Sequence, residues 1–274
     1  MANILVLASE TIGGEKLIEK IKEKAAGGDA TFYVVVPQTR PRHGNVIYDD
    51  AVRDAAQVRV DLVEAFMETE GFQGSGSVGD PDPYTAAMDA IDEHRIDEVI
   101  VSTRPQQSSG WLRRDLPERI ANASGLPVEH VVVDIDREGL PFDVTLVCAN
   151  QTVAGAELTR HLKQLAEQGP RRFIVVVPQG GGDGHSVRDA RERLNQLTES
   201  LKADGIVAAG FIGDPDPFTA IMNAVQVFYI SEIVVSTLPE NRSRWMEKGL
   251  LDRVRRASAR PIEHVESSAQ KAPA

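Results

Sequence analysis

The sequence predicts an α/β protein of two tandem doubly wound domains, each a five-stranded parallel sheet with helices on both faces. Two observations carry this prediction. The pentapeptide GDPDP occurs at 79–83 and returns at 213–217 in a matching context. In both halves, short apolar runs alternate with amphipathic helical patterns, which requires a parallel sheet with right-handed crossovers. The length of 274 residues also suits two domains of ordinary size.

The first half opens with the apolar run 4–8, which has the continuous pattern of a strand buried on both faces. After Gly13 and Gly14, apolar residues recur at helical spacing from Leu17 to Ala25, so a helix is predicted there. A second buried strand follows at 32–36.

The second half repeats this pattern. Gln38 matches Gln179, a shift of 141, whereas Gly79 matches Gly213, a shift of 134. The first half therefore has extra residues between these points, most of them at 39–45. Turn-forming residues place the boundary at 137–143, which gives one domain at 1–137 and another at 143–267.

The remaining elements follow in the same order in each half. The other predicted helices lie at about 52–69, 85–94, 112–123, 187–203, 219–228 and 246–257. The other predicted strands lie at about 74–78, 99–102, 128–133, 206–212, 233–236 and 262–265.

The GDPDP repeats predict helix starts. Proline fixes its own φ and has no N–H to lose, so Pro83 and Pro217 suit the first helical position, with Asp82 and Asp216 as N-caps. A metal site built from the aspartates is the alternative, but turn and cap duty is the commoner role for this residue type. We therefore predict no metal.

The composition narrows the function classes. With 30 basic and 41 acidic residues, the net charge is −11, which argues against a nucleic acid or an anionic membrane as partner. The single cysteine, Cys148, lies in an apolar run, so we expect a buried strand residue rather than a reactive thiol. The first apolar run is interrupted at Ser9 and Glu10, too early for a signal peptide, so the expected location is cytoplasmic.

In this order of elements, the chain resembles a tandem universal stress protein, with an adenine-nucleotide-binding-like α/β fold, over nearly its whole length. The likeness rests on the Gly-Asp-Pro turn before a helix, the apolar fourth strand, and the similar helix ends around 118–128 and 252–262. The resemblance implies a small nucleotide-binding or signalling module in a stress response, without a universal reaction.

The nucleotide-binding members of that family have an Asp at the end of strand one and a Gly-rich phosphate loop after strand four. Here strand one ends in Ala-Ser-Glu at 8–10 and Ala-Asn-Gln at 149–151, and the loops at 102–111 and 236–245 lack the G-x-x-G glycines. An ATP site, if present, is therefore altered in both halves.

The loops keep other means of binding an anion. Ser109 and Ser243 precede Trp111 and Trp245 by two residues and have the pattern of N-caps, which leave helix N–H groups facing the crevice. In the second half two arginines, at 242 and 244, flank this cap, so the second half is the better candidate site. The alternative is that the serines only cap helices, the arginines are solvated and the tryptophans pack.

In doubly wound sheets the ligand lies outside the carboxyl ends of the strands, where the strand order reverses. The candidate ligand-binding residues at these ends are Ser9, Ser102, Thr103, Ser109, Asn150, Gln151, Pro178, Gln179, Ser236, Thr237, Asn241, Arg242, Ser243 and Arg244.

The predicted function is a non-enzymatic universal stress protein that binds a nucleotide, such as ATP, or a related phosphorylated ligand. The alternative is an interaction scaffold that has lost ligand binding. An enzyme is the weakest hypothesis, because no P-loop and no Ser-His-Asp elbow is present.

The fifth strands, at 128–133 and 262–265, are nearly identical and lie at sheet edges in such a fold. Edge strands must be covered or paired. We predict that the two approach each other in an intramolecular pseudo-dimer, with Glu129, His130, Glu263 and His264 at the junction. The same edge also allows a homodimer.

Overall fold

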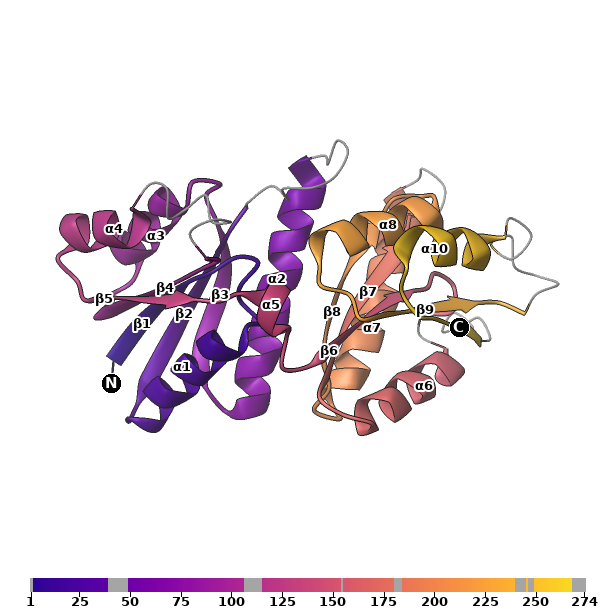
Figure 1. Cartoon of the computed structure of the whole chain (residues 1–274). Coiled ribbons are helices and arrows are strands. Elements are labelled where there is room, and N and C mark those ends of the chain that lie inside the picture. The colour runs from indigo at the N-terminus through magenta and orange to yellow at the C-terminus, as the bar shows by residue number, and fades with distance from the viewer. Residues whose placement is uncertain are drawn as a thin grey trace. The chain divides into compact units, whose positions relative to one another are not determined.

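The computed structural model describes residues 2–38, 49–105, 115–153, 155–179, 184–239, 245 and 249–267, without the side chains of 49–51 and 184–186. The chain divides into two compact units, unit 1 (Met1–Pro141) and unit 2 (Phe142–Ala274). Figure 1 shows strands and helices alternating along each unit.

Unit 1 contains five strands and their connecting helices. Its strands are β1 (Ala2–Leu7), β2 (Ala30–Pro37), β3 (Gln73–Gly79), β4 (Glu98–Thr103) and β5 (Val128–Val132). Its described helices are α1 (Glu15–Ala26), α2 (Asp49–Glu70), α3 (Pro83–Glu93), α4 (Leu116–Ser124) and α5 (Ile135–Glu138).

Unit 2 follows the same sequence of elements. Its strands are β6 (Asp143–Cys148), β7 (Arg171–Pro178), β8 (Val207–Gly213), β9 (Glu232–Thr237) and β10 (Ile262–Glu266). Its described helices are α6 (Ala156–Glu167), α7 (Gly184–Lys202), α8 (Pro217–Val227) and α10 (Leu250–Ser258).

The two sheets have one strand order. The order is β3-β2-β1-β4-β5 in unit 1 and, read in the same direction, β8-β7-β6-β9-β10 in unit 2, with every pairing parallel. Ser102 and Ser236 occupy the fifth position of β4 and of β9. The predicted fold class is therefore confirmed, and the strand order reverses between β1 and β4 and between β6 and β9.

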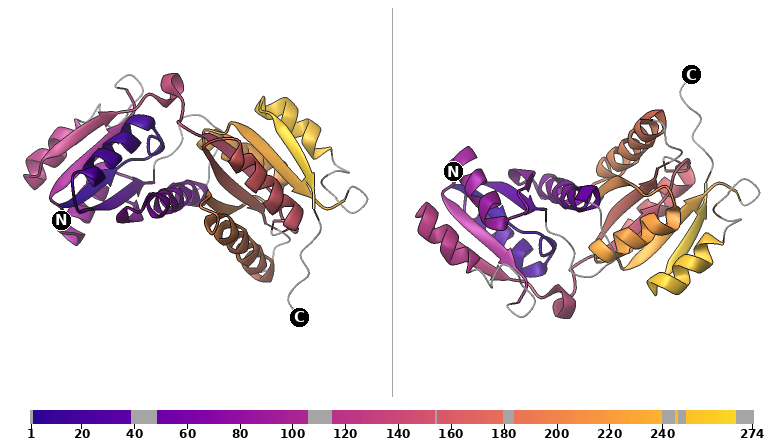
Figure 2. Two further views of the ribbon diagram at one scale, coloured as in Figure 1. Left: turned by 90° about the horizontal axis from the view of Figure 1, so that it is seen from below. Right: turned by 90° about the horizontal axis from the view of Figure 1, so that it is seen from above.

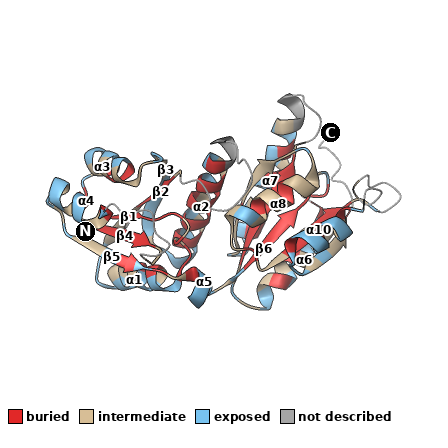
Figure 3. Ribbon diagram, turned by 45° about the horizontal axis from the view of Figure 1, so that its top comes forward, coloured by how far each residue is buried: buried red, intermediate tan, exposed pale blue. Residues whose placement is uncertain are grey.

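Helices cover both faces of each sheet, as Figures 1 and 2 show. On one face of unit 1, α3 and α4 bury Ala86, Ala90 and Ile120 against alternate residues of the strands. In unit 2, α6 and α7 bury Leu158 and Leu194 against β7. Each sheet therefore has its own apolar core, and the central strands are buried from both sides (Figure 3).

Cys148 is part of this buried layer and is fully inaccessible, as the sequence predicts. Burial, with a smaller contribution from the charge of Asp216, raises the pKa of its thiol, so a thiolate nucleophile is disfavoured. Among the described helices, none combines the length and the apolar content that a membrane crossing requires.

The GDPDP segments form the predicted turns and caps. Asp80 Oδ1 accepts the N–H of Asp82 at 2.8 Å, which closes the turn. Asp82 Oδ2 then accepts both the N–H and the hydroxyl of Thr85 at 3.1 Å, while Pro83 occupies the first helical position of α3. The corresponding bonds recur at α8 with Asp214, Asp216 and Thr219. The aspartates therefore serve the turn and the cap.

The glycine of each pentapeptide permits a close approach of helix and strand. A Cβ on Gly79 would lie 2.7 Å from Val35 Cγ1 and 2.8 Å from Ala86 Cβ. A Cβ on Gly213 would lie 2.5 Å from Val176 Cγ2. Real Cβ atoms do not approach so closely, so only glycine lets the turn return the chain onto the sheet.

The edge strand β3 is covered by α2. A Cβ on Gly76 would lie 2.7 Å from Val60 Cγ1, so the helix lies directly against the glycine-rich strand. Glu64 Oε1 accepts the N–H of Gly76 at 2.8 Å, which satisfies a donor that faces away from the sheet. Val60 and Met67 contact the strand here.

Most predicted boundaries agree with the structure to within about three residues, but α5 was not predicted. The sequence suggests only a boundary with turn-forming residues at 137–143, whereas Ile135–Glu138 forms one helical turn that Gly139 ends at φ 75°. The carbonyl of Asp134 accepts the N–H groups of Arg137 and Glu138, and Lys16 Nζ of α1 pairs with Glu138 at 2.6 Å. A distant lysine therefore helps to hold this turn, and a local pattern does not show that. The extra residues at 39–45 lie outside the described part of the chain.

Candidate functional site

In unit 1, the hydroxyls of Thr11 and Ser102 bond each other at the point where the strand order reverses. Thr11, in the loop after β1, donates its hydroxyl to the carbonyl of Ser102 at 3.3 Å and accepts the hydroxyl of Ser102 at 2.9 Å. In unit 2, Thr152 makes the first bond, to the carbonyl of Ser236, at 3.1 Å. The buried hydroxyl of Ser236 has no hydrogen-bond partner among the described residues. The loop after the first strand is thus fixed to the fourth strand in both units.

A threonine–histidine pair ends the fourth strand of each unit. His130 Nε2 lies 2.8 Å from Thr103 Oγ1, and His264 Nε2 lies 2.8 Å from Thr237 Oγ1. Each hydroxyl donates its only proton to the next carbonyl, that of Arg104 or Leu238, so each histidine donates from Nε2–H. Partial burial lowers the pKa of His130 and favours its neutral form. Thr103 and Thr237 are therefore engaged within the fold.

The carboxyl edge of unit 1 contains a group of four charged side chains. Arg104 Nε, just after β4, lies 2.9 Å from Glu10 Oε2, and Arg104 Nη1 lies 2.9 Å from Asp136. Arg59 of α2 is buried, and its Nη1 donates to the carbonyl of Ala55 at 3.4 Å. Burial lowers the pKa of Arg59, and the nearby negative charge of Glu10 raises it. Here, two carboxylates pair with Arg104, and the charge of Glu10 partly offsets the burial of Arg59.

The same edge of unit 2 has one arginine held by a neutral amide. Asn150, two residues after the end of β6, donates its Nδ2 to the carbonyl of Pro178 at 3.1 Å, so its Oδ1 is left to accept. Arg193 Nη2 of α7 donates to this Oδ1 at 3.2 Å. The buried Nε of Arg193 has no hydrogen-bond partner among the described residues, and no acidic side chain pairs with this arginine there. A cation is thus fixed at the ligand end of the sheet with spare donors.

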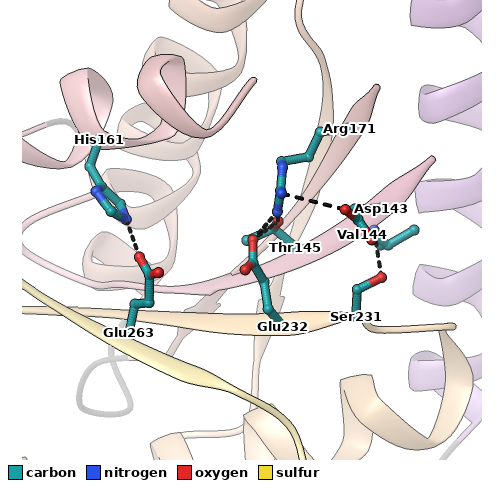
Figure 4. Close-up of polar contacts among 8 residues, drawn as sticks. All are labelled: Asp143, Val144, Thr145, His161, Arg171, Ser231, Glu232 and Glu263. Carbon is teal, nitrogen blue, oxygen red and sulfur yellow. Dashed lines mark hydrogen bonds and ion pairs between the residues drawn. The ribbon is translucent and has the colours of Figure 1, made fainter. Parts of the chain in front are cut away.

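At the opposite, amino-terminal edge of the unit 2 sheet, the arginine Arg171 is paired with acidic side chains (Figure 4). Arg171, at the start of β7, contacts Glu232 and lies 3.5 Å from Asp143 Oδ2, and its Nη1 donates to Thr145 Oγ1 at 2.8 Å. Nearby, His161 of α6 lies 2.8 Å from Glu263 of β10. These contacts tie strand starts and a helix together, and parallel α/β sheets bind ligands at the other end.

The structure describes most of the predicted site residues, and several are occupied by the fold. Ser102, Thr103 and Thr237 make the bonds given above, and the carbonyl of Ser9 accepts the N–H of Ile12. In unit 2 Pro178 accepts from Asn150, the N–H of Gln179 donates to Gly213, and Gln151 is exposed.

The remaining predicted site residues lie outside the described residues: Ser109, Asn241, Arg242, Ser243 and Arg244. Their anion-binding role stays a prediction. Of the two tryptophans, Trp245 is described and is half-buried, and Trp111 is not described.

Sequence reasoning missed the charged residues of these edges, which are Glu10, Arg59, Arg104, Asp136 and Arg193. A signal for two of them was available. Arg59 and Arg193 are related by the same shift of 134 as the GDPDP segments, and each directly precedes a core residue of its helix, Val60 or Leu194. A basic residue repeated beside the buried face indicates a position with a role at the sheet.

No group of three or more His, Cys, Asp or Glu side chains suited to a metal ion occurs among the described residues. The side chains at Arg193 and at the neighbouring ends of β6 and β9 are an amide and hydroxyls, while the carboxylates of Asp214 and Asp216 after β8 serve the turn and the cap. Amide, hydroxyl and guanidinium donors suit an anion, whereas Mg²⁺ and Ca²⁺ prefer carboxylate and carbonyl oxygens.

Comparison with known proteins gives a distant structural likeness. No protein-family model matches the sequence, and no curated protein matches it. A universal stress protein from Archaeoglobus fulgidus DSM 4304 is similar at 17% identity and a TM-score of 0.37, over 97% of this chain and 96% of that one. A functionally unknown protein from Pseudomonas aeruginosa PAO1 is similar at 15% identity and a TM-score of 0.29, over 87% and 82% of the two chains. These values are too low to bear on function, and the fold assignment rests on the strand order.

Proposed function

We propose that the protein is a non-enzymatic member of the universal stress protein family that binds a nucleotide or a related phosphorylated ligand in unit 2. The ordered motifs of both halves support the family, and the doubly wound strand order agrees with it. The ligand lies at the carboxyl ends of β6, β7 and β9, where this fold class forms its crevice.

The observation that carries the proposal is the position of Arg193. Its guanidinium lies at the carboxyl end of β6 and bonds a neutral amide, in a protein with a net charge of −11. A guanidinium has five donors and is always charged, and its geometry matches phosphate oxygens. A phosphoryl group is therefore the ligand feature that this edge suits best.

Calorimetry with ATP tests the proposal. We expect saturable binding to the wild type and a loss of about tenfold or more in Arg193→Met, since a hydrogen bond to a charged group contributes roughly 1.5–3 kcal/mol. Arg191→Met is the matched control, because Arg191 is an exposed arginine of the same helix. Equal losses in the two variants would show a nonspecific charge effect and count against the site.

A second measurement separates ligand binding from the other two hypotheses. Nucleotide that copurifies after gentle purification supports binding, and steady phosphate release from added ATP would instead indicate an enzyme. The scaffold hypothesis has its best support in unit 1, where Thr11 and Ser102 bond each other and two carboxylates pair with Arg104. It predicts that unit 1 contributes no ligand site.

A further inference from the structure

The loops after β1 and β6 match residue by residue. Ala8 N–H donates to Val35 in unit 1, and Ala149 N–H donates to Val176 in unit 2. Three residues further on, Thr11 and Thr152 donate to the fourth-strand carbonyls in the same way. Between these fixed points Glu10 corresponds to Gln151.

The arginines of α2 and α7 also occupy one structural position. Arg59 directly precedes Val60, whose Cγ1 lies 2.7 Å from a Cβ built on Gly76 of β3. Arg193 directly precedes Leu194, whose Cδ1 lies 2.6 Å from a Cβ built on Gly210 of β8. The two arginine side chains therefore start from corresponding positions of α2 and α7, each over the edge strand of its own sheet.

The surroundings of the two arginines differ in charge. In unit 1, the charge of Glu10 acts on Arg59, and Glu10 also pairs with Arg104. In unit 2, Gln151 replaces this carboxylate and Leu238 replaces Arg104. Among the described residues, the amide of Asn150 is therefore the one side-chain partner of Arg193. Buried or half-buried charges need a partner, and a buried donor without an acceptor costs free energy.

We propose that the residue at position 10 or 151 decides which unit accepts a phosphate-bearing anion. In unit 1 the Glu10 carboxylate takes the place of the anion beside the helix arginine and closes the site. In unit 2 the uncharged Gln151 leaves Arg193 open to an external anion. The location rests on the proposed function, but the charge exchange is testable with a probe that is not a nucleotide.

Exchanging the two residues tests this, with inorganic pyrophosphate as the probe in calorimetry at fixed ionic strength. We expect one site per chain in the wild type. Gln151→Glu places a carboxylate beside Arg193 and lowers the affinity by about tenfold or more. Glu10→Gln removes the negative charge that acts on Arg59 and raises the stoichiometry from one to two.

The double exchange, Glu10→Gln with Gln151→Glu, moves the single site to unit 1. Binding to this variant is then lost with Arg59→Met and kept with Arg193→Met, the reverse of the wild type. Because loss of the Glu10–Arg104 pair can destabilise unit 1, Glu10→Gln with Arg104→Leu is measured beside it. This variant gives unit 1 the residues of unit 2 at both positions, and melting by circular dichroism shows that each variant is folded.

Unchanged affinity in Gln151→Glu, a stoichiometry of one in both folded Glu10→Gln variants, or no binding to the wild type overturns the proposal. The same titrations with ATP separate it from the proposed function. If pyrophosphate follows the exchange and ATP does not bind, the nucleotide function fails and this inference stands. If ATP binds equally well to the wild type and to Gln151→Glu, the inference fails and the nucleotide function stands.

Discussion

A threonine hydroxyl has one proton, and at the end of β4 the bond that this proton makes determines which ring nitrogen of a histidine is protonated. Thr103 donates to the carbonyl of Arg104, so neutral His130 carries its proton on Nε2. Partial burial lowers the pKa of His130 from the ordinary value of 6.5. As the pH falls, His130 is therefore protonated in the unfolded chain at a higher pH than in the folded protein.

We expect stability to be unaffected by His130 above pH 6.5, to decline as the pH falls from 6.5 through the lower folded pKa, and to level off below it. In His130→Gln this part of the pH dependence disappears, while the side-chain amide still donates to Thr103. Urea unfolding of both proteins between pH 8 and 5 measures the difference. Parallel curves over this range would contradict the assignment.

The caps of α3 and α8 depend on single carboxylates. Asp82→Ala removes the acceptor of the Thr85 N–H and hydroxyl, so we expect a loss of about 0.5–2 kcal/mol in the free energy of unfolding. Asp82→Asn keeps a side-chain oxygen and is expected to lose little. Chemical denaturation compares the three proteins, and a large loss in the Asn variant would show that the charge matters more than the cap.

At the level of elements, the approach of the GDPDP turn to the sheet sets the position of α3. In Gly79→Ala the new methyl group meets Val35 and Ala86, so overpacking is expected to cost about 1–3 kcal/mol. Gly169→Ala is the matched control, because a Cβ there meets nothing within 4 Å. Thermal unfolding of the two variants checks this, and equal melting temperatures would rule out the steric role.

The elements were predictable because their causes are local. The causes are Pro83 and Pro217, the aspartate caps and the continuous apolar strands, each of which acts over a few residues. Because the sequence repeats, each pattern was also seen twice. The site was less predictable, because Glu10, Arg59, Arg104 and Asp136 meet only through the fold. The turn at 135–138 was missed for the same reason, since a lysine on α1 helps to hold it.

At the scale of the whole molecule, each unit has a core built from its own residues. We expect a fragment of residues 142–274 to fold alone, with helical circular dichroism and a cooperative thermal transition. Leu146→Ala in this fragment removes a fully buried side chain and is expected to cost about 2–5 kcal/mol. A fragment without a cooperative transition would show that unit 2 depends on unit 1.

The predicted pairing of the fifth strands stays a prediction. The order of each sheet places β5 and β10 at an edge, as that prediction requires. Their polar residues already have partners within their own unit. Glu129 pairs with Lys20 of α1 at 2.8 Å, Glu263 pairs with His161, and both histidines bond the fourth strand.

The hydrogen bond from the Gly76 N–H to the Glu64 carboxylate also has a consequence for aggregation, because it occupies a backbone donor of the edge strand β3. In unit 2 the matching residue is Thr198, whose hydroxyl bonds the carbonyl of Leu194 in its own helix, so in the described part of the chain no corresponding carboxylate bonds an N–H of β8. The strand β8 reads VAAGFIG, so it lies at the edge of its sheet without a charged residue or a proline, the features that protect edge strands from pairing with another chain. We therefore expect intermolecular strand addition on heating to begin at β8 rather than at β3, where the Gly76 N–H is already bonded to Glu64.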